Sequence, residues 1–140
     1  MKNIIILLSS AILVAGCTHG GSPEASASAQ AQAAEDEAAL ATALAGRVAG
    51  PPQDCVAEGE LGTQKTYGRN VIVFTGRTGD VLFVNRTTSA CPDVAGRSLK
   101  TTTSMTRLCR GDNIIVYEPA SGAEFGGCSL GEFTPYRRTR

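Results

Sequence analysis

The chain has 140 residues, with 13 Lys or Arg and 13 Asp or Glu, so its formal net charge is zero. Hydrophobic residues make up 42% and charged residues 19%, which is typical of a globular protein and not of a disordered one. The length suits one small domain, and the lack of a basic excess gives no support to nucleic-acid binding. The single histidine, His19, leaves little scope for metal or acid-base chemistry.

The first residues have the pattern of an export signal. Lys2 precedes an apolar run from Ile4 to Gly16, which is shorter than the roughly 20 residues that a helix needs to span a bilayer. The run ends in Leu13-Val14-Ala15-Gly16-Cys17, which resembles the lipobox of bacterial lipoproteins. The resemblance implies a signal peptide over residues 1–16 and acylation of Cys17. The alternative is an ordinary secretory signal followed by an incidental cysteine.

The same resemblance implies a location. Several acyl chains on Cys17 would anchor the protein stably to the lipid bilayer, because one chain alone binds only marginally. The domain would then face the periplasm without spanning the membrane. Thr18 follows the cysteine, and since an Asp at that position tends to retain such lipoproteins at the inner membrane, the outer membrane is favoured.

Residues 17–50 differ in composition from the rest of the chain. No Val, Ile or aromatic residue occurs between Cys17 and Val48, and Ala, Ser and Gln dominate. Such a segment buries too little apolar surface to offset its ordering entropy, so we expect a flexible tether. Residues 35–45 could form a short helix with acids at its start, and we expect it to fray within the linker and not to dock on the domain.

Residues 51–140 have the pattern of a mainly β domain. The strong strand candidates are Val71-Ile72-Val73-Phe74, Val81-Leu82-Phe83-Val84 and Ile114-Ile115-Val116-Tyr117. The first two flank a loop with two glycines, which predicts a hairpin. Weaker candidates lie at residues 55–56, 98–103 and 129–133. Because the strong runs are apolar on both faces, we expect a small disulfide-stapled barrel or sandwich of five to six strands.

Four cysteines remain once Cys17 is assigned to lipid. In an exported domain of this size, Cys55, Cys91, Cys109 and Cys128 predict two disulfides. A zinc site would need histidines or close cysteine pairs, which the domain lacks, so no metal is expected. Spacing allows three pairings. We favour Cys91–Cys109 with Cys55–Cys128, because the first encloses what looks like one strand and its return, and first and last strands of small barrels commonly pair.

The cysteine spacing and strand patterns together resemble a family of small exported proteins from proteobacteria, sphingomonad-like species among them, whose function is uncharacterised. The resemblance covers about residues 53–136 and brings no catalytic or binding residue. It rests on these segments: Asp54-Cys55-Val56, Val71-Ile72-Val73-Phe74, Val84-Asn85-Arg86, Cys91-Pro92, Arg107-Leu108-Cys109, Asp112 to Val116 and Cys128-Ser129-Leu130-Gly131-Glu132-Phe133.

No catalytic constellation is evident, so we expect no catalytic residue and no cofactor, and we interpret the protein as a non-enzyme. His19 lies on the tether and cannot meet a domain nucleophile in fixed geometry. An alternative is an envelope glycan hydrolase that uses a carboxylate pair, although acids beside Gly or Pro more often cap turns. The acids concerned are Asp80, Asp93, Asp112, Glu118, Glu124 and Glu132.

Other short motifs have ordinary structural explanations. Arg110-Gly111-Asp112 matches an integrin-binding tripeptide, but Gly-Asp before a strand is common turn chemistry. Asn85-Arg86-Thr87 fits a glycosylation acceptor, for which we expect no modification. The stretch Gly122–Gly127 predicts a hairpin turn. It and Thr75–Asp80 are the loops that an inhibitor of a periplasmic hydrolase would present.

The C-terminus carries the one notable charge cluster. Arg137, Arg138 and Arg140 are candidate contacts to an anionic surface, with a frayed soluble tail as the alternative. The sequence therefore predicts a membrane-anchored envelope lipoprotein whose small β domain binds or supports an unidentified cell-wall polymer or periplasmic protein, and not nucleic acid.

Overall fold

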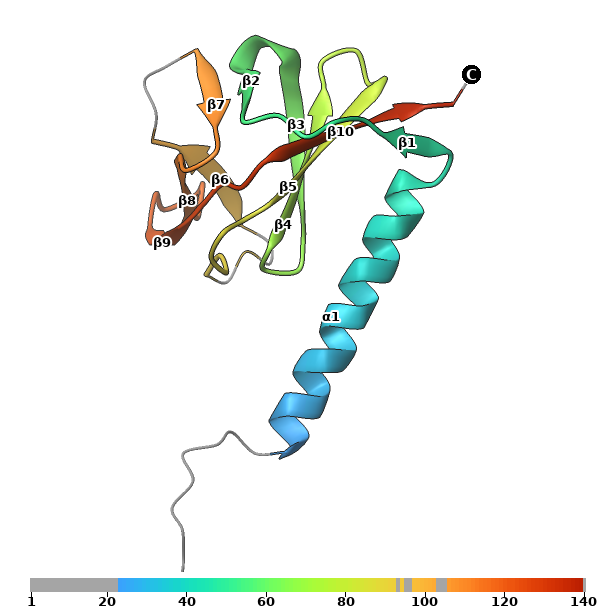
Figure 1. Cartoon of the computed structure of the whole chain (residues 1–140). Helices are drawn as coiled ribbons and strands as arrows, with labels where there is room; N and C mark the ends of the chain where they lie inside the picture. The colour runs from blue at the N-terminus through green and yellow to red at the C-terminus, as the bar shows by residue number, and fades with distance from the viewer. Residues whose placement is uncertain (1–22, 93, 95–96, 103–105, 140) are drawn as a thin grey trace, which may run out of the picture.

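The computed structural model describes residues 23–92, 94, 97–102 and 106–139, which form one long helix, one short 3-10 helix and ten strands (Figure 1). The mainly β fold is as expected. The elements are α1 (Pro23–Leu44), β1 (Arg47–Ala49), β2 (Cys55–Ala57), η1 (Glu58–Glu60), β3 (Leu61–Tyr67), β4 (Val71–Gly76), β5 (Val81–Arg86), β6 (Ser98–Thr101), β7 (Arg107–Cys109), β8 (Asn113–Tyr117), β9 (Glu124–Ser129) and β10 (Phe133–Arg138).

The strands form three antiparallel sheets in a sandwich-like arrangement. The largest has the order β1-β10-β5-β4-β3, and smaller sheets pair β6-β8-β9 and β2-β7. One face of the large sheet packs against both small sheets around a core that includes Ile72, Phe74, Ile114 and Phe133. The C-terminal part of α1 packs on the other face. Strand β4 is therefore buried on both faces, as its unbroken apolar run predicted.

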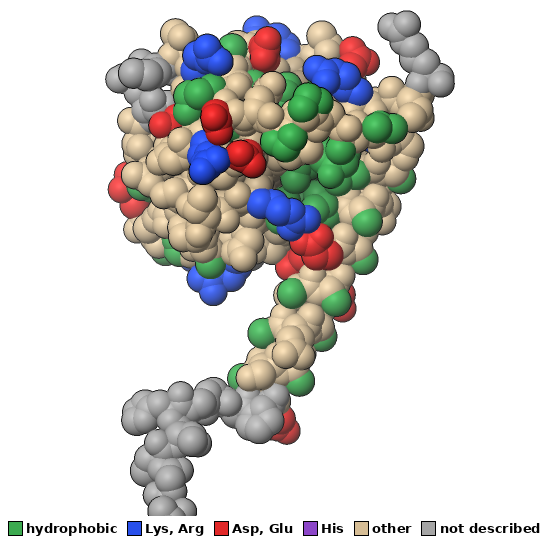
Figure 2. All heavy atoms as spheres, viewed as in Figure 1, with side chains coloured by type: hydrophobic (Ala, Val, Ile, Leu, Met, Phe, Trp, Pro, Cys, Tyr) green, Lys and Arg blue, Asp and Glu red, His purple; other side chains and the backbone are tan. Residues whose placement is uncertain are grey.

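The helix α1 contradicts the expectation of a fraying segment in a linker. It runs for 22 residues, and its C-terminal part packs Leu40, Ala43 and Leu44 on the sheet, with Leu40 only 3% exposed. Hydrophobic side chains gather where α1 meets the domain (Figure 2). Alanine, the best helix former, supplies the helical propensity, and docking of two leucines supplies what an isolated helix lacks. No helix in the described ranges is long and apolar enough to cross a membrane.

An ion pair fixes the same junction. Arg86, at the end of β5, donates two hydrogen bonds to the carboxylate of Glu37, at 2.7 and 3.1 Å. The charged hydrogen bond lowers the pKa of Glu37 below its usual value. Strand β1 lies on the N-terminal side of the boundary expected at residue 50, yet it pairs with β10 of the domain in the register Arg47↔Arg138. Residues of α1 and β1 therefore belong to the folded unit.

Both disulfides form, but the favoured pairing was wrong. The structure links Cys55 to Cys109 and Cys91 to Cys128. The two described strands between Cys91 and Cys109 do not pair with each other as a strand and its return. Strand β6 pairs with β8, and β7 pairs with β2, where Cys55 lies directly opposite Cys109. The expected pairing of the strand that carries Cys55 with a strand near Cys128 is also wrong, because Cys128 lies on β9, which pairs with β8. The last strand, β10, pairs instead with β1, and neither of these two strands carries a cysteine.

The C-terminus is a strand and not a frayed tail up to Arg138. Strand β10 pairs with β5 on one side and with β1 on the other. Pro135 interrupts its pattern, yet it is tolerated because its carbonyl accepts the Gly50 N–H where β1 has ended. In an antiparallel strand the N–H and the C=O of one residue point toward the same neighbouring strand. The N–H that Pro135 lacks would therefore point past the end of β1, outside the β1–β10 ladder.

Candidate functional site

A hollow of about 380 Å³ opens at one end of the large sheet. We call it the distal pocket. It lies where η1, the β4–β5 turn and the end of β10 meet, and its floor is made by the side chains of Val81 and Phe83. The complete lining is Gly59, Glu60, Gly76, Arg77, Thr78, Val81, Phe83 and Arg137.

The β4–β5 turn forms one wall of the distal pocket and is held from two sides. The Arg77 N–H donates to the Glu60 carbonyl at 2.8 Å, which ties the turn to η1. Arg47, just after α1, donates to the carbonyl of Asp80 at 2.8 Å and to that of Gly79 at 3.4 Å. Gly79 has a φ of +77°, which a turn of this kind requires of a glycine. The wall is therefore pre-formed.

Two guanidinium groups border the apolar floor. Arg77 and Arg137 are both exposed, and no carboxylate of the described residues forms an ion pair with either. Glu60 is the one acid in the lining, so the pocket carries a formal charge of plus one. Val48 lies opposite Arg137 in the β1–β10 register and is 58% exposed, which extends the apolar surface beside the pocket.

The structure divides the predicted arginine cluster. Side chains alternate along a strand, so Arg137 and Arg138 lie on opposite faces of β10. Arg137 lines the distal pocket, whereas Arg138 pairs in register with Arg47 on the face that α1 covers elsewhere. Arg140 lies outside the described residues, as do Cys17 and His19.

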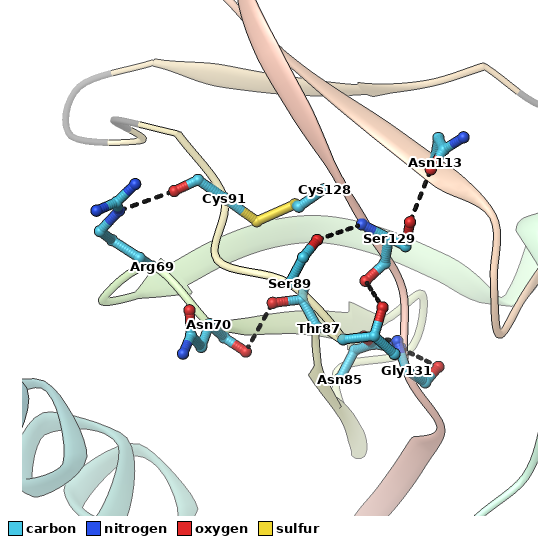
Figure 3. The surroundings of a disulfide bond; sticks show 11 residues. Arg69, Asn70, Asn85, Thr87, Ser89, Cys91, Asn113, Cys128, Ser129 and Gly131 are labelled. Carbon is cyan, nitrogen blue, oxygen red and sulfur yellow. Dashed lines mark hydrogen bonds between the residues drawn. A yellow bond between two sulfur atoms is a disulfide. The ribbon is translucent and has the colours of Figure 1, made fainter.

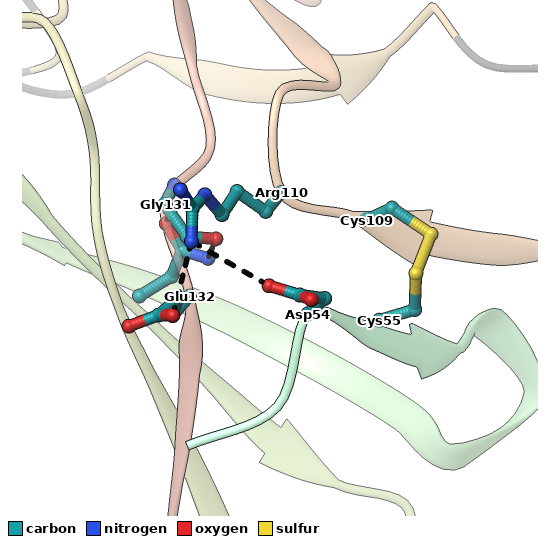
Figure 4. Close-up of polar contacts among 7 residues, drawn as sticks. Asp54, Cys55, Cys109, Arg110, Gly131 and Glu132 are labelled. Carbon is teal, nitrogen blue, oxygen red and sulfur yellow. Dashed lines mark hydrogen bonds and ion pairs between the residues drawn. A yellow bond between two sulfur atoms is a disulfide. The ribbon is translucent and has the colours of Figure 1, made fainter.

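The side chains of Arg110 and Asp112 in the Arg110-Gly111-Asp112 tripeptide form contacts within the domain, and Figure 4 shows those of Arg110. The Arg110 guanidinium lies 3.0 Å from the Glu132 carboxylate and 3.7 Å from that of Asp54. The Asp112 carboxylate accepts the Cys109 N–H at 2.8 Å, and Gly111 has a φ of +90°. The motif therefore forms the turn between β7 and β8, as turn chemistry predicted.

Four of the six acids proposed for a carboxylate pair have separate partners, and Asp80 lies apart from these four in the β4–β5 turn. Glu132 contacts Arg110, Glu124 contacts Lys100, and the Glu118 carboxylate accepts the Ala120 N–H in the turn before β9. Asp112 caps the β7–β8 turn. Asp93 lies outside the described residues. Across the described part of the chain, no group of three or more His, Cys, Asp or Glu is placed to hold a metal ion.

The sequence analysis noted Asn85 as a glycosylation acceptor but missed its structural role, since its side chain is completely buried. Its amide donates to the Gly131 carbonyl at 2.8 Å and its oxygen accepts the Gly131 N–H at 2.9 Å, close to the Cys91–Cys128 disulfide (Figure 3). Asn85 is thus part of the interior, where glycosylation has no access. The only signal in the sequence was a polar residue ending an apolar strand.

Comparison with known proteins adds no relative: no family model, curated protein or solved structure matches this chain. The resemblances to the lipobox and to the small exported proteobacterial family therefore stay predictions. The distal pocket is assigned from its own geometry.

Proposed function

We propose that the protein is a lipid-anchored envelope lipoprotein whose β domain is a binding module, held away from the membrane by α1. The observation that carries this proposal is the asymmetry of the helix. Its C-terminal part is docked on the sheet through Leu40, while residues 24–35 are exposed and the N-terminal end of the helix projects from the domain (Figure 1).

The helix gives the anchor a defined reach. At about 1.5 Å of rise per residue, its 22 residues span roughly 33 Å. It begins just after the predicted acylation site at Cys17 and starts at the opposite end of the molecule from the C-terminus (Figure 1). A docked helix sets the direction of the domain as well as its distance, which a flexible tether would not.

This orientation turns the distal pocket away from the bilayer. The pocket lies beside Arg47 and the end of β10, which are next to the last turn of α1. Arg137 and Arg138 are therefore poorly placed to touch the lipid headgroups of the membrane that carries the anchor. A ligand in the periplasm or the cell wall would reach them, and the two disulfides fit that oxidising compartment.

Membrane fractionation of the full chain in a Gram-negative host tests the anchor. Cys17→Ala should move the protein from the membrane pellet to the soluble fraction, or leave it as an uncleaved precursor. Thr18→Ala is the matched control and should remain in the outer membrane. Thr18→Asp should shift the protein to the inner membrane. Membrane attachment of Cys17→Ala as a cleaved product would contradict the proposal.

A further inference from the structure

We propose that the distal pocket binds the free C-terminal carboxylate of a peptide with a small apolar last residue. This inference rests on the proposed function only for the compartment in which the protein encounters the ligand. It depends on three features that converge on one hollow: two exposed arginines, an apolar floor and a single opposing carboxylate.

The arginines provide the recognition of charge. A guanidinium binds a carboxylate through paired N–H donors, and such charge-assisted bonds are the strong ones. Arg77 comes from the β4–β5 turn and Arg137 from β10, so the two approach the pocket from different elements. Neither has an ion-pair partner among the described residues, unlike Arg86 and Arg110, which are both paired.

The floor selects for an apolar group next to the charge. Phe83 and Val81 present their side chains to the hollow, and Val48 continues that surface across from Arg137. In a peptide whose last residue has a methyl or branched side chain, the free carboxylate and this apolar side chain lie within a few ångströms of each other. The pocket volume of about 380 Å³ accommodates one or two residues of such a peptide.

Glu60 selects against higher negative charge. With two arginines and one glutamate, the lining neutralises one negative charge, so a monocarboxylate fits better than a phosphate dianion or a polyphosphate. The free carboxylate can come from the stem peptide of a cell wall, which ends in D-residues, or from a protein C-terminus, which ends in an L-residue. Both sources share the chemistry that the pocket recognises.

The test is a titration of the full-length protein in detergent, followed by NMR at the backbone amides of Gly59, Gly76 and Thr78. The probes are acetylated trialanine with a free carboxylate, in L and D forms, its C-terminal amide, and inorganic phosphate. The carboxylate should bind at least tenfold more tightly than the amide or phosphate. The preferred enantiomer then identifies the source.

Substitutions assign the binding to the pocket. Arg77→Ala and Arg137→Ala should each weaken binding of the carboxylate about tenfold, and both residues are exposed, so the fold should persist. Arg138→Ala, on the opposite face of β10, is the matched control and should bind as the wild type does. Glu60→Gln should strengthen binding of phosphate.

Three results would overturn the inference: equal affinity for acid and amide, tighter binding of phosphate, or equal losses from Arg138→Ala and Arg137→Ala. The anchor is tested separately. If the chain is not lipidated but binds the peptide, the proposed anchoring is wrong and this inference stands. If the chain is lipidated but binds none of the probes, the anchoring stands and this inference is wrong.

Discussion

Asn85 shows how much a single buried polar residue contributes to this fold. Its two hydrogen bonds to Gly131 join the end of β5 to the segment between β9 and β10. Gly131 cannot be replaced by a larger residue, because a Cβ there would overlap the carbonyl oxygen of Arg86. The contact therefore depends on both residue types: Asn85 supplies the side-chain amide, and Gly131 lacks the Cβ for which there is no space.

Replacement of Asn85 should destabilise the domain without touching the distal pocket. Asn85→Ala leaves a buried N–H and a buried carbonyl of Gly131 without partners, at a cost of about 2–3 kcal/mol and a fall in Tm of roughly 10 °C or more. Thermal unfolding followed by circular dichroism measures this. Asn70→Ala, at an exposed position, is the control. Equal Tm values for the two variants would contradict the role of Asn85.

At the scale of elements, α1 depends on one side chain more than on any other. Leu40→Ala should cost about 2–3 kcal/mol through lost burial and the cavity left against the sheet. The helix should also become sensitive to limited proteolysis, since the remaining contacts are small. Gln30→Ala, in the exposed half, should change neither property. A helix that resists protease equally in both variants would show that Leu40 does not hold it.

The ion pair between Glu37 and Arg86 predicts how docking depends on pH. Hydrogen bonding to Arg86 lowers the pKa of Glu37 from 4.5. A lowered pKa means that the pair stabilises docking fully above that ordinary value, and that this contribution is lost as the pH falls through the lowered pKa. The Leu40 methyl resonances should therefore shift only at acid pH.

Two variants distinguish Glu37 from the carboxylate beside it. Glu37→Gln should abolish the acid-induced shift of the Leu40 resonances. Asp36, the neighbouring carboxylate, accepts a hydrogen bond from Gln32, and Asp36→Asn should leave the shift in place. Retention of the full transition in Glu37→Gln would assign it to another group.

Sequence patterns predicted some elements and not others for identifiable reasons. The cores of β4, β5 and β8 are continuous apolar runs, and all three were found at their expected positions. Strand β3 was missed because it is an edge strand with four exposed residues in succession. Helix α1 was underestimated because its alanines carry a high propensity but little hydrophobicity, and its docking depends on residues far along the chain.

The candidate site could be predicted only in part. The C-terminal arginines were noticed as a charge cluster, and Arg137 does line the distal pocket. The partnership of Arg137 with Arg77 was not visible, because 60 positions separate them in the chain. The sequence also did not show that Arg138 lies on the opposite face from Arg137, because that alternation follows only from β10 being a strand.

For the whole molecule, the two disulfides should contribute unequally. In the chain-entropy description, loops of 54 and 37 residues each give about 4 kcal/mol. Cys91 and Cys128 are buried within the core, whereas Cys55 and Cys109 are partly exposed on a two-stranded sheet. Loss of the Cys91–Cys128 disulfide therefore also removes core packing.

Double substitution tests this difference. Cys91→Ala with Cys128→Ala should lower the Tm more than Cys55→Ala with Cys109→Ala, because it adds the loss of buried sulfur contacts to the lost cross-link. Thermal unfolding of both variants, with peptide mapping of the unreduced wild type, measures the effect and the pairing. A fragment that joins Cys91 to Cys109 would contradict the observed topology.

The proposed anchoring is tested most directly by the intact mass of the protein isolated from its own membranes. We expect a chain that starts at Cys17 and ends at Arg140, increased by two or three acyl chains with their glycerol and reduced by four hydrogens for two disulfides. A mass that includes residues 1–16, carries no lipid and gains no hydrogen on reduction would contradict it.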